Sequence, residues 1–134
     1  MIYFIDTNTI SFIIKGRFPA IQGHFRKIPA QSIAIPSIVK AELEFGARHS
    51  SNYEKTIGPY NKFLEAFQIY SFNESCSYEY GKIRELLQSS GNIIGSNDML
   101  IAATVLANKG TLVTNNVREF SRVPGLLVED WTVQ

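Results

Sequence analysis

Short apolar runs rich in β-forming residues recur along this 134-residue chain, and segments with helical spacing separate them. We expect strands over residues 2–5, 32–35, 67–70 and 111–114, and a short last strand over 126–128. Strands that alternate with helices predict an α/β fold with a mostly parallel central sheet flanked by helices. The length fits one domain, residues 1–134.

Five segments are expected to be helical, and residues 16–29 are expected to be loop and irregular helix. The helices are predicted over about 7–15, 37–48, 54–66, 74–89 and 99–107. Thr7 and Ser37 are candidate N-caps, and Ser96, Asn97 and Asp98 supply capping side chains for the last helix. That helix is apolar on nearly every side, which predicts that it is buried all round.

Charge and cysteine content exclude several classes of function. Lysine plus arginine is 13 and aspartate plus glutamate is 12, so the formal net charge is +1 and no strong overall field attracts polyanions. The single Cys76 excludes an internal disulfide framework, which fits a reduced, cytoplasmic setting. The apolar run before Asp6 is too short for a signal peptide, and no stretch is long enough to cross a membrane.

Asp6 is the first candidate for chemistry, because it directly follows the first predicted strand. In open α/β sheets the functional crevice lies beyond the carboxyl ends of the strands. Asp6 is therefore a candidate metal ligand or acid–base group. The alternative is that it only caps the following helix.

Glu42 is a sharper candidate because of its place on the predicted helix 37–48. On a helical wheel it falls inside a broad apolar arc, whereas Glu44 falls outside it and is expected to be a solvated surface charge. The arc comprises Ile38, Val39, Leu43, Phe45, Gly46 and Ala47. A buried carboxylate needs a partner, a proton or a metal, and the alternative to a functional role is an internal ion pair, for example with Arg84.

Three further residues lie near the same predicted edge. Asp98 opens the apolar helix, where it either stabilises the helix dipole or adds a third carboxylate to the site. Asn116 and Glu119 follow the fourth strand, and Glu119 is alternatively a surface residue on a short helix. Carboxylates crowded together repel one another unless they are protonated or bind a cation. Oxygen ligands of this kind select Mg²⁺ or Mn²⁺, and such an ion polarises a phosphate and activates water.

Five motifs in order resemble the PIN-domain family, and more narrowly the VapC toxins of bacterial toxin–antitoxin pairs. They are I-D-T-N at 5–8, A-E-L-x-x-G-A at 41–47, I-G-S-N-D-M-L-I-A-A at 94–103, T-N-N-x-x-E-F at 114–120 and P-G-L-x-V-E-D-W at 124–131. Each motif alone is weak, but together they cover essentially the whole chain in the right order and spacing.

The resemblance implies a Mg²⁺- or Mn²⁺-dependent endoribonuclease with metal ligands Asp6 and Asp98. Glu42 would complete the ligand shell or orient the water, and Thr7, Asn8 and Thr114 would hold those carboxylates. It also implies a small antitoxin partner, a homodimer and a structured RNA substrate, often transfer RNA.

Two positions depart from the family pattern. Asn116 stands where many PIN domains carry a fourth acid, which Glu119 would replace, and Val39 stands where relatives often have Thr or Ser. RNA affinity would need a local set of cations, for which the candidates are Lys15, Arg17, Arg26, Lys27, Lys40, Arg48 and His49.

Two rival readings belong to another functional class. One is a receiver-like module with an acidic metal-binding pocket. A receiver needs paired acids after its first strand, whereas here Asp6 is followed by Thr7 and Asn8. The other is a PIN-like domain that binds RNA or protein without cleaving it.

Overall fold

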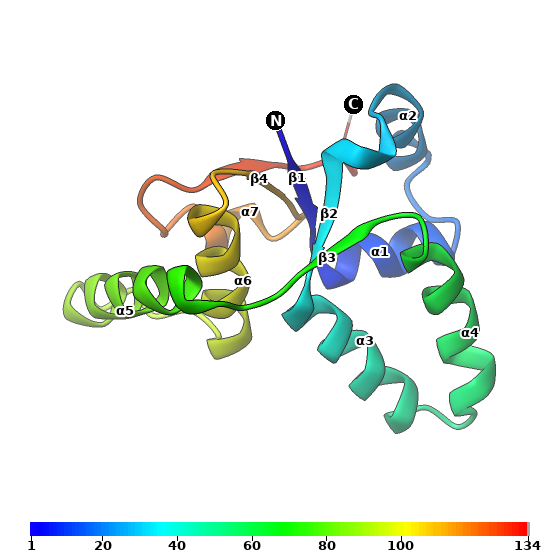
Figure 1. Cartoon of the computed structure of the whole chain (residues 1–134), viewed down its shortest axis with the longest axis horizontal. Coiled ribbons are helices and arrows are strands. Elements are labelled where there is room, and N and C mark those ends of the chain that lie inside the picture. The colour runs from blue at the N-terminus through cyan, green and yellow to red at the C-terminus, as the bar shows by residue number, and fades with distance from the viewer. Residues whose placement is uncertain (134) are drawn as a thin grey trace.

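A computed structural model describes residues 1–133, and within them five strands form one wholly parallel sheet (Figure 1). The strand order is β3-β2-β1-β4-β5. The strands are β1 (Tyr3–Ile5), β2 (Ile33–Pro36), β3 (Gln68–Tyr70), β4 (Thr111–Val113) and β5 (Leu127–Glu129). The predicted α/β class with a parallel sheet is confirmed, and each predicted strand agrees with the observed one to within one residue at either end.

The helices connect and flank these strands. They are α1 (Thr7–Ile14), α2 (Pro19–Lys27), α3 (Ser37–His49), α4 (Tyr53–Leu64), α5 (Glu74–Ser89), α6 (Ser96–Ala107) and α7 (Val117–Phe120), with a 3₁₀ turn at Ala30–Ser32. Helices α3 and α4 pack together on one side of the view in Figure 1, and α5 and α6 pack together on the other. None of the helices in the described part of the chain is long and apolar enough to cross a bilayer.

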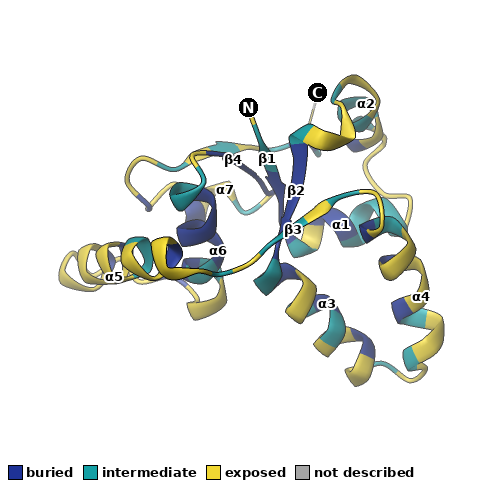
Figure 2. Cartoon of the chain, viewed as in Figure 1, coloured by how far each residue is buried: buried dark blue, intermediate teal, exposed yellow. Residues whose placement is uncertain are grey.

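The core lies around β1, β2, β4 and α6. Phe4, Leu112 and Val105 are completely buried. Figure 2 shows the inner strands and much of α6 as buried, whereas most of α5 is exposed. The prediction that α6 is surrounded by protein is confirmed for its central part, since residues 101–105 are all buried.

Several local expectations were wrong. Residues 19–27 form a regular helix, because Pro19 at its start supplies a helical φ without needing a hydrogen-bond partner. The N-cap of α1 is Asp6 rather than Thr7. Helices α3 and α6 begin without a side-chain cap. The Ser37 hydroxyl instead accepts a hydrogen bond from the Phe72 amide at 3.2 Å.

The pairing of β1 with β4 determines which residues meet beyond the sheet. Ile5 lies opposite Val113, so Asp6 and Thr114 emerge side by side at the same edge. The backbone amide of Asp6 donates to the Val113 carbonyl at 3.1 Å, which fixes the direction in which the chain leaves β1. This edge holds the candidate site.

Candidate active site at the carboxyl edge of the sheet

A small polar cavity of about 150 Å³ opens beyond the carboxyl ends of β1 and β4. Its walls come from α1, α3, α6 and the segment after β4. The lining residues are Asp6, Thr7, Asn8, Glu42, Asp98, Ile101, Asn116 and Phe120. Residues far apart in the sequence therefore meet at the place where open parallel sheets bind their ligands.

Asp6 is both a helix cap and part of the cavity wall. Its side chain is only 6% exposed, and Oδ1 accepts a hydrogen bond from the Thr9 amide at 2.9 Å. Burial raises the pKa of the Asp6 carboxyl, although hydrogen bonds from Thr114 and Thr9 act in the opposite direction. The two interpretations of Asp6 are thus compatible, because one carboxylate oxygen is enough for the cap.

Glu42 is held at the cavity by two donors from other helices. The Thr7 hydroxyl donates to Oε1 at 2.5 Å, and the Asn97 amide nitrogen donates to Oε2 at 3.3 Å. The suggested ion pair with Arg84 is wrong, because the Arg84 guanidinium donates to the Tyr80 hydroxyl at 3.0 Å. Hydrogen bonding therefore orients Glu42 while leaving its charge without a cationic partner in the described chain.

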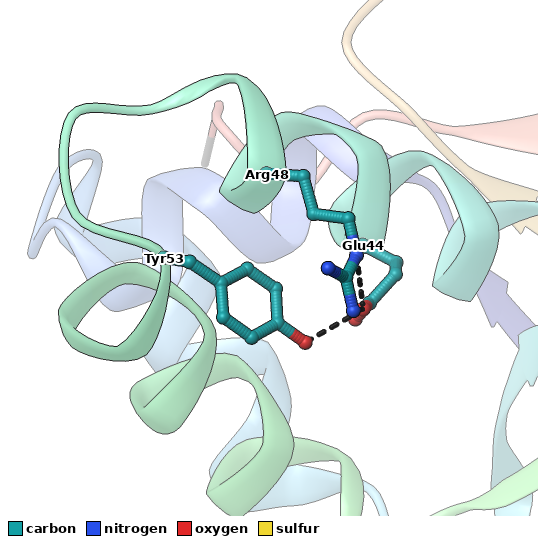
Figure 3. A network of polar contacts seen from close by, with 3 residues as sticks. All are labelled: Glu44, Arg48 and Tyr53. Atoms are coloured by element: carbon teal, nitrogen blue, oxygen red, sulfur yellow. Dashed lines mark hydrogen bonds and ion pairs between the residues drawn. The ribbon is translucent and has the colours of Figure 1, made fainter.

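Glu44 lies outside the cavity, as expected from the helical wheel, and it is paired as well as solvated (Figure 3). Its Oε1 accepts from Arg48 Nε at 3.1 Å and from the Tyr53 hydroxyl at 2.6 Å. The Tyr53 hydrogen bond and then Arg48 lower the pKa of Glu44. Arg48 also lies over the Tyr53 ring at 4.4 Å, so this candidate RNA contact is already engaged.

Asp98 and Glu119 form a carboxyl pair at the mouth of α6. Burial, a hydrogen bond to Glu119 and the nearby negative charges raise the pKa of Asp98 to about 7. The Gly95 amide donates to Glu119 at 3.0 Å and the Asn116 amide donates at 2.7 Å, and these bonds lower the pKa of Glu119. Burial and the neighbouring charges thus favour the protonated form of Asp98, whereas the Gly95 and Asn116 donors favour the ionised form of Glu119.

Asn116 and Glu119 occupy different places relative to the cavity. Asn116 lines it, with its backbone amide bound to the Thr114 hydroxyl at 3.0 Å. Glu119 is not among the lining residues and is linked to them through Asp98 and Asn116. Asn8 lies in the wall, while Thr7 and Thr114 bond to Glu42 and Asp6.

The donor chemistry of the cavity fits a hard divalent cation. Asp6, Glu42 and Asp98 present carboxylate oxygens, and no sulfur or imidazole donor lies among the lining residues. Within residues 1–133, however, no three acidic, histidine or cysteine side chains are arranged closely enough to form a ready metal site. Asp6 and Glu42 instead accept hydrogen bonds from protein donors, whereas Asp98 pairs with the Glu119 carboxyl, and both arrangements relieve mutual repulsion.

Asn97 is a site residue that the sequence did not reveal. We expected it to cap α6, but its side chain crosses to Glu42 on α3. The only feature of the sequence that could have indicated a role at the site was its position next to Asp98. A polar residue in the first turn of a helix is normally explained by capping alone.

Comparison with known proteins places this geometry in a family. The profile of the PIN domain matches residues 3–126. Ribonuclease VapC2 of Rickettsia felis is 39% identical over 132 residues, covering 98% of each chain. The tRNA(fMet)-specific endonuclease VapC of Salmonella typhimurium is 32% identical, covering 96% of this chain and 97% of the relative. The crystal structure of VapBC2 from Rickettsia felis bound to a promoter DNA fragment superposes with a TM-score of 0.92 at 38% identity, covering 98% and 99% of the two chains.

Proposed function

The chain belongs to the PIN domain family, and from that premise we propose that it is the endoribonuclease toxin of a VapBC-type toxin–antitoxin pair. The observation that carries the proposal is the polar cavity at the carboxyl edge of the sheet, to which Asp6, Glu42 and Asp98 all contribute. The relatives named as ribonucleases span nearly the full length of this chain, so the whole fold is shared. A receiver-like module does not belong to this family.

Asp6, Glu42 and Asp98 would hold Mg²⁺ or Mn²⁺. When bound, such an ion lowers the pKa of water and offsets negative charge on a phosphodiester. The chain's own contribution is to fix the carboxylates. Asp6 is fixed by the Thr9 amide, and Glu42 by Thr7 and Asn97. Two of the three carboxylates are thus already oriented by protein donors, and a bound cation would have to draw all three closer together than they lie here.

Asp98 and Glu119 would work as a unit. Glu119 keeps its own charge through the Gly95 and Asn116 donors and accepts the Asp98 proton. A cation at the cavity would compete with that proton for Asp98. The Asn116 amide, in the place of a fourth acid, orients Glu119 and adds no charge. Glu119 would therefore support the site through its contacts with Asp98 and Asn116.

The partner and substrate follow from the same comparisons. Solved structures of relatives are complexes of toxin with antitoxin, some of them bound to DNA. We propose a cognate antitoxin, a structured RNA substrate such as transfer RNA, and a homodimeric toxin. An arginine of the antitoxin would suit the acidic cavity, since guanidinium groups bind carboxylates through two parallel hydrogen bonds.

The decisive experiment measures RNA cleavage by the purified chain with EDTA, Mg²⁺ or Mn²⁺. Cleavage should disappear with EDTA and return with either ion. The Asp6→Asn variant should lose activity by orders of magnitude while remaining folded by circular dichroism. Metal-independent cleavage, or full activity of a folded Asp6→Asn variant, would show that the site lies elsewhere. Metal binding without any cleavage would support the rival reading of a domain that only binds.

A further inference from the structure

A second, largely apolar groove of about 520 Å³ runs beside the acidic cavity, between α3 and α6. Its walls include Ile38, Ala41 and Phe45 of α3 and Leu100 of α6. The groove and the cavity share two lining residues, Thr7 and Glu42. A chain-like ligand with one group in the cavity would therefore place its neighbouring group in this groove.

Phe45 is the feature of this groove that packing does not explain. Its helical position predicts burial with Val39, Leu43 and Ala47, which are indeed buried. Phe45 is 70% exposed, so that expectation was wrong for this residue. Helix α3 packs against α4, α1 and α6, but none of them covers the Phe45 side chain, which lines the open groove.

The Phe45 ring is arranged for stacking. It lies nearly parallel to the His49 ring one turn further along α3, with ring centroids 5.7 Å apart and planes inclined by 16°. That contact covers part of one face and leaves most of the Phe45 ring exposed. An aromatic ring exposed in this way is a surface on which flat groups stack, and every nucleobase has such a face.

The charges around the site make stacking more important. The net charge of +1 gives little general attraction for RNA, and the acidic cavity repels a phosphate unless a cation is bound. Arg48, the nearest arginine on α3, already pairs with Glu44 and Tyr53 (Figure 3). An uncharged contact next to the cavity would therefore add affinity that this modest set of charges does not supply.

We propose that the groove between α3 and α6 receives a nucleobase adjacent to the scissile phosphate, with Phe45 as its stacking surface. The proposal rests on the proposed ribonuclease function and adds a substrate-positioning residue to it. Removing one such stacking contact reduces affinity by roughly 5- to 150-fold. Because the contact is uncharged, its share of the affinity should change little with salt.

The test uses the full chain and a 12-nucleotide single-stranded RNA of mixed sequence that carries 2-aminopurine, whose fluorescence falls when it stacks on an aromatic ring. Binding is measured in the Asp98→Asn background to prevent cleavage, with and without Phe45→Ala and Phe45→Trp. The matched control is Tyr78→Ala, since Tyr78 on α5 is 69% exposed but lies outside both cavities. In the active protein, kcat and KM are measured for the same substitutions.

The expected result is that Phe45→Ala removes the fluorescence quenching and weakens binding by roughly 5- to 150-fold, that KM rises by a similar factor, and that kcat changes little. Phe45→Trp should restore both, and Tyr78→Ala should change neither. If Phe45→Ala leaves KM and the quenching unchanged, the inference about the groove is wrong. Metal-dependent cleavage by the wild type would in that case still support the proposed function. If the wild type does not cleave RNA, the proposed function is wrong. The quenching measurement would then still show whether a nucleobase stacks on Phe45 in the groove.

A second copy of the chain is the competing occupant of this groove. Sedimentation equilibrium of wild type and Phe45→Ala separates the two cases. If Phe45→Ala converts a dimer to a monomer, the groove is an interface between copies and the nucleobase proposal is wrong. An unchanged mass together with the loss of quenching supports it.

Discussion

Replacing Asp98 by asparagine should stabilise the metal-free protein at pH 8 and leave its stability at pH 4 unchanged. Asparagine has the same shape, and its amide can still donate to Glu119 as the protonated Asp98 does. The change therefore removes only the charge that the cavity disfavours. At pH 4 the Asp98 carboxyl is already neutral in the folded protein, so little remains to be gained.

The size of the effect follows from the pKa of Asp98, which rises from 3.8 to about 7. At about 1.36 kcal/mol per tenfold change in acidity, the upper limit is about 4 kcal/mol. Asp98 is half-buried, and solvent screening reduces this to about 1–2 kcal/mol. With about 2.1 cal/mol/K of unfolding entropy per residue, the melting temperature should rise by about 4–7 °C at pH 8.

The sign of the pH dependence is fixed by the direction of this change. A carboxyl whose pKa is raised by folding contributes its full stability below pH 3.8, and that stability is lost as the pH rises through about 7. The gap between variant and wild type should therefore open across this interval and level off near pH 8. The matched control is Glu44→Gln, which should destabilise at pH 8 because Tyr53 and Arg48 lower the pKa of Glu44.

The melting temperatures of the wild type, Asp98→Asn and Glu44→Gln are measured by circular dichroism at pH 4, 6 and 8 in EDTA. Equal melting temperatures of wild type and Asp98→Asn at pH 8, or a gap of the same size at pH 4, would refute the argument that burial and neighbouring charge oppose ionisation of Asp98. In a separate series without EDTA, adding Mg²⁺ should raise the melting temperature of the wild type more than that of the variant, since a ligand that binds more tightly stabilises the folded state more.

Three further predictions concern the other site residues. Glu42→Gln should lower the rate of RNA cleavage by roughly 100-fold or more, whereas Glu44→Gln, two residues along the same helix, should change it by less than about twofold. Equal effects of the two substitutions would show that Glu42 does not belong to the site. Asn116→Asp should tighten Mg²⁺ binding in calorimetric titration and lower the melting temperature of the metal-free protein, and its effect should be coupled to that of Glu119→Gln. If neither substitution changes the Mg²⁺ affinity, neither residue acts on the metal, and additive effects would refute the idea that Glu119 compensates for Asn116. In a complex with the antitoxin, an arginine or lysine of the partner should lie within hydrogen-bond distance of Asp6, Glu42 or Asp98, and an inhibited complex whose cavity stays open would contradict this mechanism.

The site itself was only partly predictable from the sequence. The sequence made Asp6 a candidate because it follows an apolar strand, Asp98 because it opens an apolar helix, and Glu42 because it interrupts an apolar helical face. The sequence could not show that Thr7 binds Glu42, that Asn97 binds it from another helix, or that Glu119 pairs with Asp98. Those contacts join residues separated by 35, 55 and 21 positions.

Local sequence patterns determined the elements of this protein, because apolar periodicity and strand-forming residues act over a few neighbouring positions. The alternation of strands and helices was sufficient for the parallel sheet, since a crossover between parallel strands needs a helix of about that length. The order β3-β2-β1-β4-β5 was decided only in three dimensions, and it is this order that places Asp6 beside Thr114. The exposure of Phe45 was decided there too, because whether an apolar side chain is buried depends on which elements pack against it.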